Sequence, residues 1–267
     1  MKNVLDPPVE RDLPPGKAAR MRADLMTSIH RPRPRTAVRL GIATLAAAAA
    51  VVAGVAVAPN GDDVQHLAMG PGELSPTLRQ AMEQCLSWNA QTDRLPVSLD
   101  QLAVAAEQHH RAVALFMTDT GYLTCDVSMS PGEEISGSVS GERDWPQRDW
   151  LPGPVQRLLL TSTEIDGGDV AVTGRVSARV HRLLLEHGDG QTTAARVKDG
   201  VFGLLTGGAS VNEDAELVSY DATGTEIDRR LLFRPSDEFD TCYADSSGTP
   251  VYGKRGTDCL PAERWSP

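Results

Sequence analysis

The sequence lacks the short motifs that mark the commonest enzyme classes. It contains no Gly-x-Ser-x-Gly, no Ser-x-x-Lys, no His-Glu-x-x-His and no Gly-x-x-x-x-Gly-Lys that is followed by Ser or Thr. These absences remove the usual signatures of hydrolases, transpeptidases, metalloproteases and phosphate-binding loops. A Ser, His and Asp triad that only folding brings together stays open, because such triads are recognised by geometry and not by order along the chain. We therefore expect no enzymatic activity and no resident cofactor.

Cysteine is absent from the first 84 residues of the chain. The four cysteines that follow are Cys85, Cys125, Cys242 and Cys259. No Cys-x-x-Cys pair occurs among them, which argues against a zinc site of the usual spacing. Paired cysteines are typical of an oxidising compartment. Four cysteines allow three pairings, of which proximity along the chain favours Cys85 with Cys125 and Cys242 with Cys259.

Charge and proline are absent from residues 40–58, LGIATLAAAAAVVAGVAVA. A helix of this length spans about 28 Å, close to the hydrocarbon thickness of a bilayer. Because a helix satisfies its own backbone polar groups in lipid, we expect one transmembrane helix here, with the lipid bilayer as its partner. Ala46, Ala50, Gly54 and Ala58 form a row of small residues that favours a homodimer through this anchor, although the composition explains such a row equally well.

Basic residues are concentrated before the apolar segment. Residues 1–39 contain nine Lys or Arg and four Asp or Glu, whereas residues 60–267 contain 17 basic and 32 acidic residues. Because positively charged flanks stay in the cytoplasm, we expect residues 1–39 inside a cell membrane and the C-terminal part outside it. The acidic outer part argues against nucleic-acid binding, which needs Lys and Arg to neutralise phosphates.

A secretory signal peptide is the alternative interpretation of the same segment. Ala56-Val57-Ala58 has the small-x-small form of a cleavage site. However, the leading polar region is longer than that of a usual signal peptide, and Pro59 would follow the cut. The sequence therefore favours an uncleaved anchor.

The predicted cytoplasmic tail contains one segment with helical periodicity. Ala18, Met21, Leu25 and Ile29 recur at helical spacing within residues 17–30, which predicts a short amphipathic helix. Three interpretations stay open. The helix lies on the inner leaflet, it docks on a cytosolic partner, or it frays in water while its arginines only fix the topology.

Residues 59–153 are expected to form a helix packed on a β-meander. Ser75 is placed to cap a helix that begins at Pro76 and carries Cys85 on its apolar face. Extended segments follow, LAVAAEQ, RAVALFMT and YLTCDVSM, although the first of them is preceded by a capping box and a helix is the alternative there. The polar stretch up to Pro154 contains Trp145 and Trp150, which form a contact surface or anchor the loop to the neighbouring core.

Residues 154–267 predict an antiparallel β-sandwich-like region. The seven segments VQRLLLTSTEI, DVAVTGRV, ARVHRLLLEH, TTAARV, VFGLLT, AELVSYD and TEIDRRLLF are separated by turn signals rich in Gly and Asp. The tail between Cys242 and Cys259 is poor in apolar residues, so we expect its disulfide to replace a core. The predicted fold class is therefore α+β, mainly β, behind one transmembrane helix.

Candidate metal-binding side chains are scattered along the chain. His109, His110, His181 and His187 show no spacing that gathers them, so we expect no metal site. The acidic group Asp237, Glu238, Asp240 and Asp245 lacks the alternating spacing and central glycine of a calcium loop. A solvated acidic face is the better interpretation of that group.

A resemblance extends over most of the chain. The order LPPGKAARMRADLMTSI, an Ala and Val anchor, LRQAMEQCL, YLTCDV, GRVSARVHRLLLEHGDGQTTAARVKDGVF and VSYDATGTEID resembles uncharacterised single-pass membrane proteins of high-GC Gram-positive bacteria. This resemblance implies location and topology. The layout is also similar to that of anti-sigma factors, but the tail has His30 and no cysteine and so departs from their zinc-binding form.

Three functional hypotheses follow from the sequence. The leading one is a membrane-anchored, extracytoplasmic and non-enzymatic binding or sensing module, whose partner is an envelope ligand or protein. The alternatives are a regulatory protein acting on a cytosolic partner such as a sigma factor, and an envelope hydrolase of unrecognised type. An enzyme needs a concave pocket with converging titratable side chains, whereas a binding module needs a complementary patch or edge.

Overall fold

The computed structural model describes residues 65–92, 95–130, 132, 134–233, 241–253 and 258–266. All of them belong to one compact unit, Ala56–Pro267. The tail helix predicted in residues 17–30 and the anchor predicted in residues 40–58 lie outside the described residues. Within the part of the chain that is described, no helix is long and apolar enough to span a bilayer.

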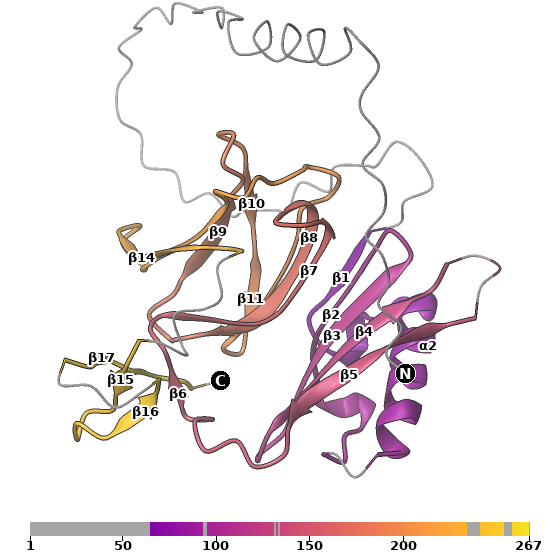
Figure 1. Ribbon diagram of the computed structural model, residues 1–267, viewed down its shortest axis with the longest axis horizontal. Coiled ribbons are helices and arrows are strands. Elements are labelled where there is room, and N and C mark those ends of the chain that lie inside the picture. Colours follow the sequence, from indigo (N-terminus) through magenta and orange to yellow (C-terminus); the bar gives the residue numbers. More distant parts are fainter. Residues whose placement is uncertain are drawn as a thin grey trace, which may run out of the picture. The chain divides into compact units, whose positions relative to one another are not determined.

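The first layer is a five-stranded antiparallel sheet in the order β1-β2-β3-β4-β5 (Figure 1). Its strands are β1 His66–Ala68, β2 Leu102–Gln108, β3 Arg111–Met117, β4 Tyr122–Ser128 and β5 Ser136–Glu142. The segment LAVAAEQ is therefore a strand. The capping box of Ser98 and Gln101 closes only the short 3-10 turn Leu99–Gln101 that precedes this strand. The predicted meander is confirmed.

Helix α2, Pro76–Ala90, covers one face of this sheet. The Ser75 hydroxyl accepts a hydrogen bond from the Leu78 amide at 3.0 Å, and Pro76 occupies the first turn, as the sequence predicts. The apolar stripe of α2 is buried against alternate residues of β2, β3 and β4. These buried residues include Leu78, Met82, Phe116 and Leu123. A short 3-10 turn, Pro71–Glu73, precedes the helix.

Two further antiparallel sheets follow, with the orders β11-β12-β8-β7 and β10-β9-β13-β14. Their strands are β7 Val155–Glu164, β8 Gly167–Val176, β9 Arg182–Glu186, β10 Thr192–Ala194, β11 Arg196–Lys198, β12 Val201–Leu205, β13 Glu216–Tyr220 and β14 Glu226–Leu231. Val172, Phe202 and Leu204 of the first sheet share one core with Leu185 and Leu217 of the second. These two sheets give the sandwich-like packing that the sequence predicts.

One predicted strand is divided in the structure. The segment TTAARV is interrupted at Ala195, where the chain leaves β10 in one sheet and enters β11 in the other. The segment ARVHRLLLEH is extended only from Arg182 onward. The alternation of polar and apolar residues in the sequence cannot reveal that the chain passes from one sheet to another. Both halves of the divided strand keep the same polar and apolar order.

The five-stranded sheet packs through its second face onto β12 and β8. Val104 and Leu115 share a buried cluster with Val201. Gly203 permits this close approach, because a Cβ atom there would lie 2.5 Å from Cγ2 of Val104 and 2.8 Å from Cδ1 of Leu67. The sequence predicts a boundary between two regions at residues 153 and 154. In the structure the strands before and after this boundary share a buried interface.

The C-terminal residues form two small sheets. β15 Tyr243–Ala244 pairs with β16 Pro250–Tyr252 and β17 Leu260–Pro261, and β18 Glu263–Arg264 pairs with β6 Trp150–Leu151. The Cys242–Cys259 disulfide joins the residues that come just before the neighbouring parallel strands β15 and β17. Trp265 is buried in the cluster that also holds Val104 and Val201, which ties the end of the chain to the larger sheets.

Candidate functional site

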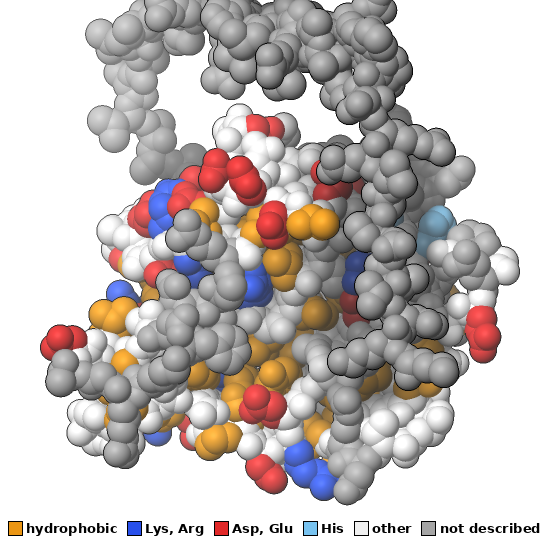
Figure 2. All heavy atoms as spheres, in the orientation of Figure 1, with side chains coloured by type: hydrophobic (Ala, Val, Ile, Leu, Met, Phe, Trp, Pro, Cys, Tyr) orange, Lys and Arg blue, Asp and Glu red, His pale blue; other side chains and the backbone are white. Residues whose placement is uncertain are grey.

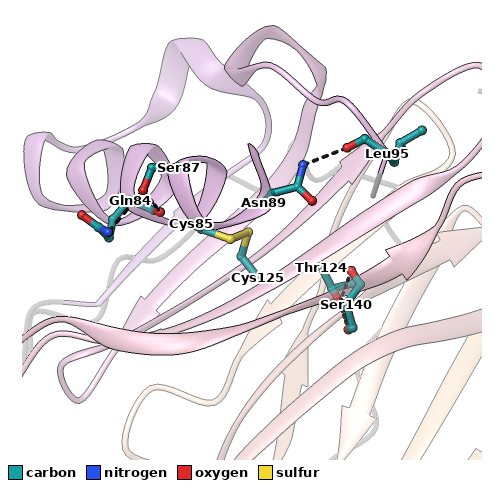
Figure 3. Close-up of a disulfide and its surroundings, with 8 residues drawn as sticks. All are labelled: Gln84, Cys85, Ser87, Asn89, Leu95, Thr124, Cys125 and Ser140. Carbon is teal, nitrogen blue, oxygen red and sulfur yellow. Dashed lines mark hydrogen bonds between the residues drawn. A yellow bond between two sulfur atoms is a disulfide. The ribbon is translucent and has the colours of Figure 1, made fainter. Parts of the chain in front are cut away.

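The four cysteines form the two disulfides that the sequence favours. Cys85 of α2 bonds to Cys125 of β4, and both are fully buried beneath the helix (Figure 3). Cys242 bonds to Cys259 across 17 residues of chain. In the chain-entropy model each closure stabilises by about 3 to 4 kcal/mol. Both disulfides are structural crosslinks, so the candidate functional site lies elsewhere in the chain.

The loop between β5 and β6 is anchored by its first tryptophan. Trp145 is 7% exposed, and its ring centroid lies 4.5 Å from that of Tyr122 at the start of β4. The Trp145 amide donates to the carbonyl of Thr120 at 2.8 Å. Of the two interpretations of the tryptophan loop, the one in which the indole anchors it to the core is confirmed for Trp145.

A buried guanidinium organises this region. Arg175 of β8 is fully buried, with its Cζ 3.8 Å from the centroid of Trp145 and 5.0 Å from that of Trp265. Its Nε donates to Oε1 of Gln156 at 3.0 Å, and its Nη2 donates to the Trp150 carbonyl at 2.9 Å. Further bonds from Arg175 reach the Arg148 carbonyl and the Tyr252 hydroxyl.

A cleft of about 900 Å³ lies beside this buried cation. Its walls are the start of β4, the end of β5, the tryptophan loop, the edge of β7 and the strand β16. The lining residues are Tyr122, Glu142, Trp145, Gln147, Gln156, Arg157, Leu158, Leu159, Leu160, Pro250, Val251, Tyr252 and Gly253. Its volume lies near the upper end of the range of ligand pockets.

The composition of the cleft favours binding over catalysis. Its described lining has one carboxylate, Glu142, one guanidinium, Arg157, and no Ser, Thr, Cys or His. Acid–base catalysis by paired carboxylates, or nucleophilic catalysis by a hydroxyl or thiol, therefore has no set of groups on these walls. Apolar walls with a few fixed polar groups are typical of ligand sites. The space-filling view shows hydrophobic side chains gathered over the lower central part of the visible face (Figure 2).

A second, smaller pocket of about 280 Å³ lies at the turn between β2 and β3. His109 and His110 occupy this turn with φ of 49° and 58°, a conformation that costs L residues energy and that histidine adopts more readily than most. Nε2 of His109 lies 2.5 Å from Oδ2 of Asp169 on β8. This is the pairing of titratable groups that the hydrolase hypothesis requires.

Hydroxyl groups also line this second pocket, but two of them are engaged within the β7–β8 hairpin. The Ser162 hydroxyl donates to the Glu164 carbonyl at 2.8 Å, and the Thr163 hydroxyl accepts from the Asp169 amide at 2.9 Å. These bonds account for both groups as parts of a hairpin. The hydrolase hypothesis stays a prediction without a defined nucleophile.

The remaining polar candidates are separated. His181 is exposed, whereas His187 is buried with its Nε2 2.8 Å from the Thr193 hydroxyl. In the described part of the chain, no three His, Cys, Asp or Glu side chains are grouped for a metal ion. Asp237, Glu238 and Asp240 lie outside the described residues. Asp245 accepts bonds from the Ser247 and Thr249 amides within a turn.

Arg175 and Tyr252 are the residues that sequence reasoning missed. In the pattern DVAVTGRV the arginine falls on the same face of β8 as Ala171 and Thr173. Its partners come from the tryptophan loop, from β7 and from Tyr252 near the C-terminus, which no local spacing brings together. A charged residue inside an otherwise apolar strand was the single available signal.

Comparisons with known proteins do not identify a family for this chain. No family model, no curated protein and no solved structure matches the chain.

Proposed function

We propose that the protein is a membrane-anchored binding module of the cell envelope that holds its ligand, without chemical change, in the cleft beside Arg175. Residues 1–39 lie in the cytoplasm, residues 40–58 cross the membrane, and residues 59–267 lie outside. This topology is supported by the charge-free apolar run and by the nine basic residues before it. Two disulfides and no free cysteine among the described residues suit an oxidising exterior.

The observation that carries the proposal is the cleft of about 900 Å³ and the rigidity of its walls. Gln156 and Tyr252 line the cleft and are both hydrogen-bonded to Arg175 behind it. Trp145 is held between that guanidinium and Tyr122. Walls fixed in this way need little reordering when a ligand enters, so less free energy is lost on binding.

A cleft-filling substitution tests this function. Gln147 lines the cleft and is half-buried, so Gln147→Trp places a large ring inside it. The full chain in detergent micelles is titrated with two probes, short N-acetylated glycan chains and a library of seven-residue peptides. We expect at least one probe to bind the wild type and to bind Gln147→Trp at least tenfold more weakly.

The matched control is Asp144→Trp, an exposed position of the same loop that does not line the cleft. This variant should bind the probes as the wild type does. The proposal is wrong if neither probe binds the wild type, or if both tryptophan variants bind equally well.

A further inference from the structure

We infer that the ligand is an extended polypeptide segment, which adds to the edge of β7 as a further strand inside the cleft. This inference rests on the proposed function, because it names the class of ligand that the cleft takes. Strand addition gives affinity through main-chain hydrogen bonds and selectivity through alternate side chains. Four observations on β7 and its surroundings support it.

The cleft runs along the edge of β7. Five consecutive residues of that strand, 156–160, line it. Neighbouring side chains of a strand point to opposite faces, and here Leu159 packs with Ala106 and Val113 of the first sheet, whereas Leu160 packs with the interior of the two-sheet core. Because the cleft touches residues whose side chains point to opposite faces of β7, it must follow the edge of that strand. At this edge the main-chain N–H and C=O groups are exposed.

The register of β8 shows which of these main-chain groups point outward. The Thr206 amide donates to the Val170 carbonyl, so the main-chain N–H and C=O groups of Val170 point toward the β12 side. In an antiparallel ladder this direction alternates, so Val172 also faces β12. Ser162 and Leu160 pair with Val170 and Val172. The main-chain groups of Leu160 and Ser162 therefore point away from β8, toward the unpaired side.

The first part of the same edge, at Val155 and Arg157, is covered. Arg230 of β14 donates to the Val155 carbonyl at 2.6 Å, and Arg157 donates to the Leu232 carbonyl. Charged side chains on an edge prevent pairing with other strands. In the described part of the chain, no such bond reaches the main chain of Leu160, and the edge is left open where the cleft begins.

The opposite wall suits an inserted strand by shape and by chemistry. Pro250, Val251, Tyr252 and Gly253 line it, and they belong to or follow β16, an edge strand of its own small sheet. Pro250 has no amide hydrogen, so this wall offers mainly apolar contact. The five lining residues of β7 include a bulge between Arg157 and Leu159, so at about 3.3 Å per residue they match a segment of about four residues.

The bound segment should have apolar side chains at alternate positions. Leu158, Leu159 and the Trp145 ring give the cleft part of its apolar lining. Glu142 and Arg157 supply one charge of each sign on its walls, so a segment of low net charge fits best. An anionic polymer such as nucleic acid has no complementary surface here.

Backbone methylation of the ligand is the direct test. The full chain in detergent micelles is titrated with a library of seven-residue peptides that alternate apolar and polar residues. Each peptide that binds is made again in two forms, N-methylated at the odd or at the even positions. We expect one form to bind at least tenfold more weakly and the other to keep its affinity, because only alternate amides of an added strand face β7.

Two protein variants complete the experiment. Leu160→Pro removes an outward amide inside the cleft and should abolish peptide binding, whereas Ser162→Pro removes an outward amide beyond the cleft and should not. The inference is overturned if neither methylated form loses affinity. It is also overturned if only glycan chains bind, a result that would leave the proposed function intact. Loss of all probe binding in the wild type would instead refute the function itself.

Discussion

The buried imidazole of His187 couples the stability of the folded part of the chain to pH. His187 follows β9 and is 1% exposed, with its amide bonded to the Gln191 carbonyl and its carbonyl bonded to the Asn212 amide. Burial lowers the pKa of His187 below its ordinary value of 6.5, and the nearby Asp189 opposes this shift only in part. The folded protein therefore keeps this side chain neutral under conditions in which the unfolded chain is protonated.

The sign of the resulting pH effect follows from this lowered pKa. Above about pH 6.5 both states are neutral and the full stability is present. As the pH falls below 6.5, the unfolded state takes up the proton first, so stability is lost. We expect the urea midpoint to fall less between pH 7 and pH 5 in His187→Gln than in the wild type. An equal fall in both would refute this role, and exposed His181→Gln is the control that should behave as the wild type.

At the scale of elements, the tryptophan loop, β7 and the C-terminal strands are held together through Arg175. The guanidinium donates to two carbonyls of the loop, to the Gln156 amide oxygen and to the Tyr252 hydroxyl. Removing it takes a donor from the buried Gln156 side chain and from three partly buried oxygens, and each buried group left unsatisfied costs about 1 to 3 kcal/mol. The walls of the cleft therefore depend on one side chain of β8.

Arg175→Met tests this dependence while keeping most of the buried volume. We expect the free energy of unfolding in urea to fall by at least about 3 kcal/mol, with changed near-UV circular dichroism of Trp145 and Trp265. Arg179→Met is the control, because Arg179 is exposed and its ion pair with Glu263 contributes at most about 1 kcal/mol. A loss below about 1 kcal/mol for Arg175→Met, with an unchanged spectrum, would contradict the account.

Local signals predicted most elements, and long-range contacts explain what they missed. The capping Ser75, the helix behind it and the meander follow from spacing and turn chemistry, which act over a few residues. The division of TTAARV at Ala195 depends on which sheet each half meets. The Arg175 cluster and the cleft gather residues separated by more than 100 positions, as Gln147 and Tyr252 show, so no window of sequence contains them.

At the scale of the whole molecule, the sequence predicts an anchor in residues 40–58, and the structure describes the part of the chain that follows it. The predicted anchor ends at Ala58, and described structure begins at Gln65, shortly before β1.

Site-specific labelling of intact cells tests this central claim most directly. Because the native cysteines are paired, a new cysteine is the reactive thiol, and Ile165→Cys places one at a position that is 97% exposed. Ser28→Cys places another in the predicted tail. With a membrane-impermeant maleimide, we expect the cysteine at position 165 to be labelled in intact cells and the one at position 28 only after permeabilisation. Equal labelling of both in intact cells, or a soluble chain that begins near Pro59, would contradict the account.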